Sequence, residues 1–288
     1  MTPTPPSRGS RLLRLGGILG ALFAVAIAVT LLTNGGGGDS LNPIAQAAAV
    51  TEESSGARFS LHGTVEQSSL PQPIPVSGAG VLNSQANRSQ MTFTMSTPKG
   101  EVEMEAIGDG SEIYLKSSLF KSLPDGDEWV GYDAALGNSS EATVGASSNP
   151  SQQLDLLRGV SDEFQNLGKR TIRGVRTTGY RAALDIGHYA DYLRGKGDDR
   201  AADDYERVAE VAPTTAEIET WIDDEKLVRQ TTVTTHTRDP SASETSSTTT
   251  TMDLRDFGIS PEIQPPDPST VYDVTSKIRA QLGLDGSS

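Results

Sequence analysis

The chain has 288 residues, a formal net charge of −14 and no cysteine. Without cysteine there is no disulfide, thiolate nucleophile, zinc–thiolate site or acylated lipobox. The excess of acidic over basic residues disfavours binding to nucleic acid or anionic headgroups. Only 35% of the residues are hydrophobic and 5% are aromatic, which suits a sheet with one solvent-exposed face or a partly hollow interior.

An apolar, uncharged run opens the chain. Leu15–Thr33 follows Arg8, Arg11 and Arg14 and, as a helix, spans roughly 28 Å, close to the thickness of a hydrocarbon core. This predicts a transmembrane helix or uncleaved signal anchor, with residues 1–14 as a basic cytoplasmic N-terminus. We therefore expect a single-pass protein of the cell membrane whose C-terminal domain is extracytoplasmic.

Two other features of this region leave alternatives open. Ala45-Gln46-Ala47 fits a small-x-small cleavage site, so a secretory signal cleaved near Ala47 competes with a retained anchor. Gly16, Gly20 and Ala24 repeat every fourth residue, a spacing that would allow a weak dimer through close helix packing.

Residues 34–56 are rich in Gly, Ala, Ser and acidic side chains and show no apolar period, which predicts a flexible linker before a folded domain at 57–288. Alternating apolar residues then predict half-buried strands. Reversals at Thr97–Gly100 and Gly108–Gly110 favour an antiparallel meander. The strands are expected around Phe59–Val65, Val76–Leu82, Met91–Met95, Val102–Ala106 and Ile113–Lys116.

The second half of the domain mixes helices with strands. Pro150–Gly159 predicts a short helix, and residues 187–212 carry the clearest helical stripe outside the membrane segment, ended by Pro213. The proline-rich stretch Ser260–Thr270 is expected to be extended, and a short helix follows around Val274–Leu284. Further strands are expected at Phe164–Leu167, Thr171–Ile172, Thr177–Leu184, Glu217–Asp223, Leu227–His236 and Thr245–Phe257.

Four stretches carry a resemblance to a known family. They are Ile113–Lys116 with Leu123–Val130; Asn149–Gly159; Thr171–Val175 with Thr178–Tyr180; and Trp221–Asp223 with Leu227–Arg229, closed by Met252–Gly258. In this order the chain resembles the LprG/LppX group of mycobacterial lipoproteins, whose fold is related to the carrier LolA and the sensor RseB. The resemblance spans roughly Phe59 to Asp273 and includes no catalytic signature.

The resemblance implies an α+β fold in which a strongly curved antiparallel β-sheet, a half-barrel, has helices packed on its concave face. An apolar cavity between them would bind acylated lipids or glycolipids. A dry core without a cavity is the alternative. The chain departs from the lipoproteins because it lacks a lipobox cysteine, so the transmembrane helix must replace the acyl anchor. Candidate cavity residues are Phe93, Met95, Met104, Leu115, Tyr205 and Val208.

Signals for catalysis or metal binding are weak. His62, His188 and His236 fall in different predicted elements, and no catalytic motif accompanies them. The acidic cluster at Asp198–Asp204 lacks EF-hand spacing and suits solvated charges near a helix start better than calcium. We expect no metal, no cofactor and no enzymatic activity.

Two functions follow. The first is a membrane-anchored extracytoplasmic protein that binds a lipid or acyl ligand, in lipid or lipoprotein transfer or envelope sensing. The alternative is a protein-interaction or sensor module of the cell envelope that uses the half-barrel as a scaffold. The expected partners are a lipid or acylated molecule, the membrane and another envelope protein, without nucleic acid.

Overall fold

A computed structural model describes residues 43–68, 70–97, 100–109, 112–120, 123–133, 160–184, 190–191, 194–195, 199, 214–239 and 244–277. The expected membrane segment 15–33 and the predicted helix at 150–159 lie outside these ranges, as does most of 187–212. Within them, no helix is long and apolar enough to cross a membrane.

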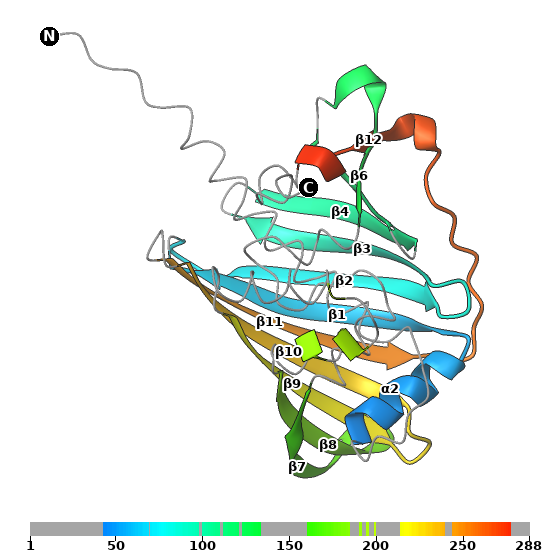
Figure 1. The fold of residues 1–288 in the computed structure, drawn as a ribbon, viewed down its shortest axis with the longest axis vertical. Helices are drawn as coiled ribbons and strands as arrows, with labels where there is room; N and C mark the ends of the chain where they lie inside the picture. The colour runs from blue at the N-terminus through cyan, green and yellow to red at the C-terminus, as the bar shows by residue number, and fades with distance from the viewer. Residues whose placement is uncertain are drawn as a thin grey trace, which may run out of the picture.

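One open sheet dominates the described residues (Figure 1). Its spatial order is β12-β6-β5-β4-β3-β2-β1-β11-β10-β9-β8-β7, and every neighbouring pair is antiparallel except β12 and β6, which are parallel. The curved antiparallel sheet expected from the sequence is therefore confirmed. The strands are β1 (Gly56–Gln67), β2 (Ile74–Asn83), β3 (Arg88–Thr97), β4 (Gly100–Asp109), β5 (Glu112–Ser117), β6 (Trp129–Asp133), β7 (Val160–Ile172), β8 (Val175–Leu184), β9 (Thr214–Asp223), β10 (Val228–Asp239), β11 (Glu244–Arg255) and β12 (Val271–Asp273).

Helix α2 (Pro43–Glu53) corrects the expectation of a flexible linker at 34–56. Ile44, Ala47, Ala48 and Thr51 recur at helical spacing, and all four side chains are buried. Proline suits the first position of the helix, and three of the four buried residues are apolar but mostly small. The helix contacts β9 and β10, so the folded domain begins by residue 43 rather than at 57.

The strands differ from the predicted ones in two respects: the short strands β6 and β12 were not predicted, and two predicted strands are joined into one. The expected strands at 164–167 and 171–172 are parts of a single strand, β7, whose pairing with β8 shifts register twice. The turn from β7 to β8 places Arg173 and Gly174 at positive φ, 47° and 85°, as a two-residue hairpin turn of the primed type requires. Glycine at the second position accepts this backbone without strain.

The C-terminal part is extended, as predicted, and returns to the far edge of the sheet. Short 3₁₀ helices η1 (Pro124–Gly126) and η3 (Pro268–Thr270) precede β6 and β12. The segment 258–267, which we call the strap, connects central β11 to edge strand β12 and runs past one end of the intervening strands (Figure 1). Asn83 Nδ2 donates to the Pro261 carbonyl at 2.9 Å and Arg88 Nη1 to the Ile263 carbonyl at 3.1 Å, which fixes the strap to β2 and β3.

Candidate functional site

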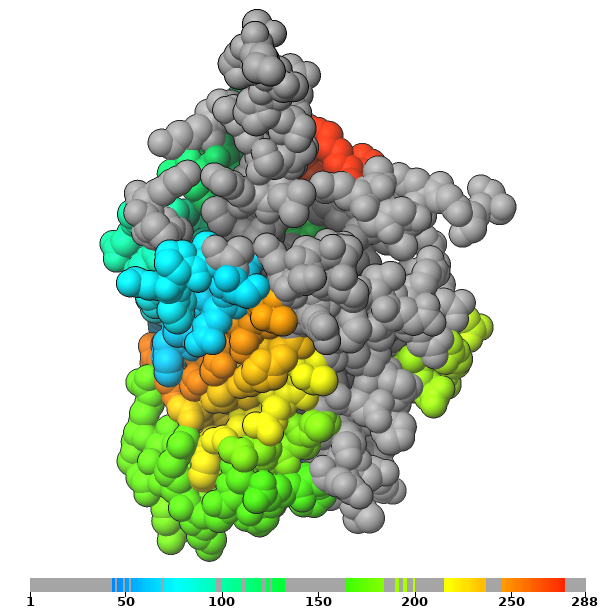
Figure 2. Space-filling model, turned by 90° about the vertical axis from the view of Figure 1, so that its left-hand side faces the viewer, coloured from blue at the N-terminus to red at the C-terminus, as the bar shows by residue number. Residues whose placement is uncertain are grey.

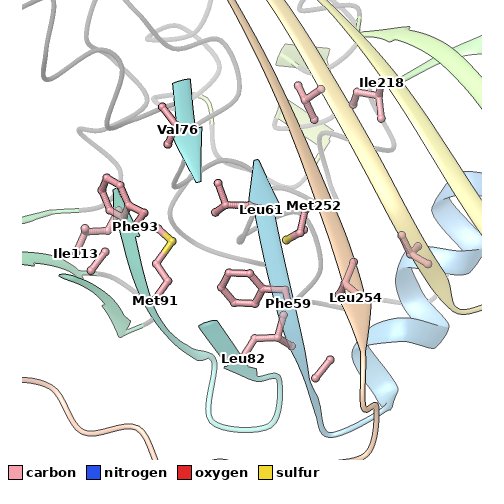
Figure 3. Close-up of a cluster of buried hydrophobic side chains, with 14 of the residues drawn as sticks. Phe59, Leu61, Val76, Leu82, Met91, Phe93, Ile113, Ile218, Met252 and Leu254 are labelled. Atoms are coloured by element: carbon pink, nitrogen blue, oxygen red, sulfur yellow. The ribbon is translucent and has the colours of Figure 1, made fainter. Parts of the chain in front are cut away.

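Apolar side chains collect on one face of the sheet, which we call the inner face. On β1, Phe59 and Leu61 point to it because successive strand residues alternate between faces. Phe59 lies opposite Leu254 of β11, and Leu61 lies opposite Met252. Helix α2 belongs to the same buried cluster. Figure 3 shows the labelled side chains of β1, β2, β3 and β11 directed into one common space.

Glycines on β2 allow this face to bend. Gly80 lies opposite Phe59, and a Cβ atom there would come within 2.5 Å of the Phe59 ring. Gly78 lies opposite Phe93, where a Cβ would come within 2.7 Å of the Phe93 Cβ. Glycine in a strand interior often marks a tight bend or a close approach, and here the backbone of β2 leaves room for both aromatic residues.

Four of the six predicted cavity residues lie on the inner face. Phe93, Met95 and Met104 are each 1% exposed and Leu115 is 4% exposed. Phe93 and Met104 are direct cross-strand partners, and Leu115 reaches the same region next to Ala106 of β4. The structure therefore brings these four together in one cluster, while Tyr205 and Val208 lie outside the described residues.

Methionine is concentrated on this surface. Apart from Met1, the chain has four methionines, and Met91, Met95, Met104 and Met252 are all buried in the inner-face cluster. Met91 and Met252 were missed as candidates. Met91 shares the period of Phe93 and Met95, which the sequence does reveal. Met252 stands in a threonine-rich strand, and only the pairing of β11 with β1 shows that it faces Leu61.

Toward β9, β10 and β11 the inner face becomes hydroxylated. Thr220, Thr231, Thr235 and Thr250 are 3%, 3%, 8% and 4% exposed. They alternate with apolar residues such as Ile218 and Val233, which lie on the same face. No sequence motif predicts these threonines, because β-branched residues suit either face of a strand.

The opposite, outer face is held by ion pairs and stacking. The Trp221 ring packs on Gly179, and the Arg170 guanidinium lies 4.0 Å from the ring centroid. Arg173 Nη2 donates to Asp253 Oδ2 at 3.2 Å, bringing the β7–β8 turn toward β11. Asp223 begins the β9–β10 turn, and its Oδ1 accepts from the backbone N–H groups of Glu225 and Leu227, both at 2.9 Å.

The histidines that were considered as bases do not converge within the described part of the chain. His62 on β1 and His236 on β10 are both exposed on the outer face, with β11 between their strands. His188 lies outside the described residues. The inner face itself holds Tyr132, which is buried beside Ile113 on the neighbouring strand; burial raises the pKa of its hydroxyl well above the ordinary value and keeps it neutral.

An open pocket of about 710 Å³ lies at the rim of the sheet, away from the predicted cavity residues. Glu66, Ser247, His236 and Thr215 line it from the outer face, and the β1–β2 connection closes one side. Figure 2 looks onto this end of the molecule, where the cyan β1–β2 region lies beside orange β11 and yellow β10. Most of the residues that line it are of polar types, whereas the buried side chains of the inner face are mostly apolar.

The chain matches several solved structures. No protein-family model matches it, and no curated protein matches it. Lipoprotein LppX of Mycobacterium tuberculosis matches with a TM-score of 0.42 at 13% identity, covering 77% of this chain and 96% of LppX. LprF of Mycobacterium bovis matches with a TM-score of 0.36 at 17% identity, covering 79% and 98%.

A lipoprotein-sorting protein domain of Vibrio parahaemolyticus also matches, with a TM-score of 0.30 at 7% identity, covering 77% of this chain and 95% of that domain. LppX-type structures are thus among those that the comparison returns, as the sequence motifs predicted.

Proposed function

We propose that this protein binds the hydrocarbon chain of a lipid or acylated molecule against the inner face of its sheet, without catalysis. In this proposal residues 15–33 anchor the protein in the cell membrane and residues 43–288 form its extracytoplasmic domain. The ligand would be handed over a short distance or sensed, because an anchored protein cannot shuttle freely.

The observation that carries the proposal is the methionine content of the inner face. Every methionine after Met1 lies there, together with two phenylalanines, Phe59 and Phe93. Methionine has an unbranched, polarisable side chain that adapts to irregular apolar shapes, and it is over-represented on surfaces that accept variable apolar partners. A core that only had to be dry and rigid would favour Leu, Ile and Val, whose rotamers are better defined.

Binding can be measured with the full chain in detergent-free nanodiscs, using a fluorescent fatty-acyl probe. The variants M95W and M104W add volume where the chain would lie, so we expect probe affinity to fall about tenfold or more. M95L and M104L keep the volume nearly constant and serve as matched controls, with affinity expected within about twofold of the parent. Thermal unfolding of each variant separates lost binding from lost folding.

Organic extraction of the purified protein followed by mass spectrometry supplies an independent test. We expect a co-purifying acylated molecule that is depleted in M95W and M104W. A folded parent protein that neither retains lipid nor binds the probe would rule the proposal out. Retention of an envelope protein partner by folded M95W and M104W, without lipid, would favour the scaffold function instead.

A further inference from the structure

The open pocket of about 710 Å³ at the rim of the sheet, which we call the rim pocket, plays no part in the proposed lipid site. Its volume lies within the range of about 300–1,000 Å³ that is common for small-molecule sites. Strands β1, β9, β10 and β11 supply its floor, and the connection between β1 and β2 supplies a wall. The rim pocket is therefore a second place where a ligand fits.

Four polar side chains form a row across the floor. His236 of β10 lies opposite Thr215 of β9 on one side and Ser247 of β11 on the other. Ser247 in turn lies opposite Glu66 of β1. Opposite residues of an antiparallel pair share a face, with Cβ atoms about 4.5–5.5 Å apart. The row thus places a hydroxyl, an imidazole, a second hydroxyl and a carboxylate side by side on the outer face.

These side chains are accessible from solvent. Glu66, His236 and Thr215 are exposed, and Ser247 is partly exposed. A ligand therefore reaches their polar groups by displacing water, without rearranging the sheet.

The wall of the rim pocket is apolar and held in place. Pro71 and Pro73 have fixed φ angles and carry apolar rings. Leu70 packs against the inner-face cluster. The Ser68 N–H donates to the Thr245 carbonyl at 2.9 Å, and the Thr245 N–H donates to Ser68 Oγ at 3.1 Å. Because the wall is fixed before a ligand arrives, binding costs less ordering.

The charges of the lining restrict the ligand. In the described part of the chain the lining has one carboxylate, Glu66, and no lysine or arginine. An anion would meet this carboxylate without a cationic group to offset the repulsion. No three His, Cys, Asp or Glu side chains among the described residues lie close enough together to hold a metal ion.

The hydrogen-bonding groups of the lining favour a polyhydroxylated ligand. Apart from Glu66, the polar side chains are hydroxyls, amides and an imidazole, which both donate and accept hydrogen bonds. A sugar hydroxyl also donates and accepts, whereas an ammonium group only donates. A sugar ring has in addition an apolar C–H face, which matches the rings of Pro71 and Pro73.

We propose that the rim pocket binds a neutral saccharide, with its hydroxyls on Glu66, His236 and Ser247 and its C–H face on Pro71 and Pro73. This site lies on the outer face and is separate from the acyl site, so the inference goes beyond the proposed function. A free sugar and the end of a glycan chain present the same hydroxylated ring, and the test distinguishes these two sources.

Saturation-transfer NMR on the full chain in nanodiscs measures this binding. The probes are glucose, mannose and galactose, each with its methyl glycoside, its uronate and its 2-amino derivative. We expect at least one neutral sugar to bind saturably, and more tightly than its two charged derivatives. A methyl glycoside that binds as tightly as the free sugar indicates a glycan end as the source, whereas binding of the reducing sugar alone indicates a free sugar.

The double variant E66A/H236A removes the carboxylate and the imidazole from the floor. We expect its sugar affinity to fall about tenfold or more, because hydrogen bonds to a charged group and to a neutral group are both lost. H62A/E103A is the matched control, since it removes the same two residue types from exposed positions outside the rim pocket. Its sugar affinity should be unchanged, and thermal unfolding shows whether each variant is folded.

The outcomes separate this site from the lipid site. Equal sugar affinity in E66A/H236A and the parent overturns the assignment to the rim pocket. Absence of saturable binding of all three neutral sugars by the folded parent overturns the proposal, as does tighter binding of a charged derivative. The fluorescent fatty-acyl probe should bind E66A/H236A and the parent equally, so a failure of the saccharide site leaves lipid binding to be judged on its own.

Discussion

At the scale of single residues, the contact between glycine and aromatic rings shapes the inner face. Phe59 is fully buried because its ring lies over Gly80, a position where any side chain would occupy the same space. The same relation recurs on the outer face, where Trp221 covers Gly179 and a Cβ would come within 2.7 Å of the ring. These glycines are selected for the volume that they leave empty.

The variant G80A tests this relation. Its new methyl group would lie 2.5 Å from the Phe59 ring and 2.2 Å from the carbonyl oxygen of Gln90, which belongs to the backbone and cannot rotate away. We expect the free energy of unfolding to fall by about 1–3 kcal/mol, measured by urea denaturation. G108A is the matched control, because its methyl group would meet only the Ser89 hydroxyl, which can rotate. Equal losses for both variants would contradict the argument.

At the scale of elements, one hydroxyl of helix α2 is hydrogen-bonded to the sheet, in addition to the helix's buried apolar side chains. Thr51 Oγ1 donates to the Ala47 carbonyl at 2.7 Å and accepts from the Val228 N–H at 2.9 Å. The second bond satisfies a buried donor at the start of β10, where the pairing with β9 has a register shift. The small residues Ala47 and Ala48 let the helix approach the sheet closely.

Replacing Thr51 by valine should therefore destabilise the domain by about 1–3 kcal/mol, because the Val228 N–H stays buried without an acceptor. T51S keeps the hydroxyl and should lose less than half of that amount. Chemical denaturation gives the free energies, and hydrogen exchange at Val228 reports the freed donor directly. If T51V were as stable as T51S, the hydrogen bond would have no role in holding α2.

The same helix bears on the processing of the N-terminus. Cleavage after Ala47 would separate Ile44 and Ala47 from Ala48 and Thr51 and divide a helix whose apolar side is buried. Cleavage near Ala47 would therefore remove part of the buried surface of α2 from the folded domain.

At the scale of the whole molecule, the sheet is open. Strand β6 is covered at one edge by β12, which comes near the end of the sequence. β12 adds to β6 in parallel, and the contact is extended by two backbone bonds, from Glu128 N–H to the Thr270 carbonyl at 3.0 Å and from Val274 N–H to the Gly131 carbonyl at 2.9 Å. Ile263 of the strap is 3% exposed. The C-terminal segment therefore links the centre of the sheet to its edge.

A chain truncated after Gly258 should keep β1 to β11 but lose this link. We expect a lower unfolding temperature, faster hydrogen exchange in β6 and a greater tendency to aggregate, because an uncovered edge strand exposes backbone groups that can pair with other chains. Truncation after Lys277 removes only residues beyond the described part and is the control. Unchanged exchange in β6 after the shorter truncation would show that β12 does not protect this edge.

The sequence by itself determined the long strands and most of their turns, because period-two alternation and turn residues such as Gly174 are local signals. It also placed Phe93, Met95, Met104 and Leu115 among the candidates, since each belongs to an alternating apolar run that marks one face of its strand. It did not predict the short strands β6 and β12, whose few residues show no such alternation. It missed α2, whose buried stripe of one isoleucine, two alanines and a threonine carries too little apolar contrast to be recognised beside a glycine-rich segment.

Only the tertiary structure decided which strands are neighbours and therefore which side chains share a surface. Strand β1 pairs with β11, almost two hundred residues away, and this pairing places Met252 beside Leu61 and gives Thr250 an inward position. The physical reason is that a strand pattern defines two faces but not their neighbours, which depend on register with distant segments. The division of the inner face into an apolar and a hydroxylated part is a property of that register.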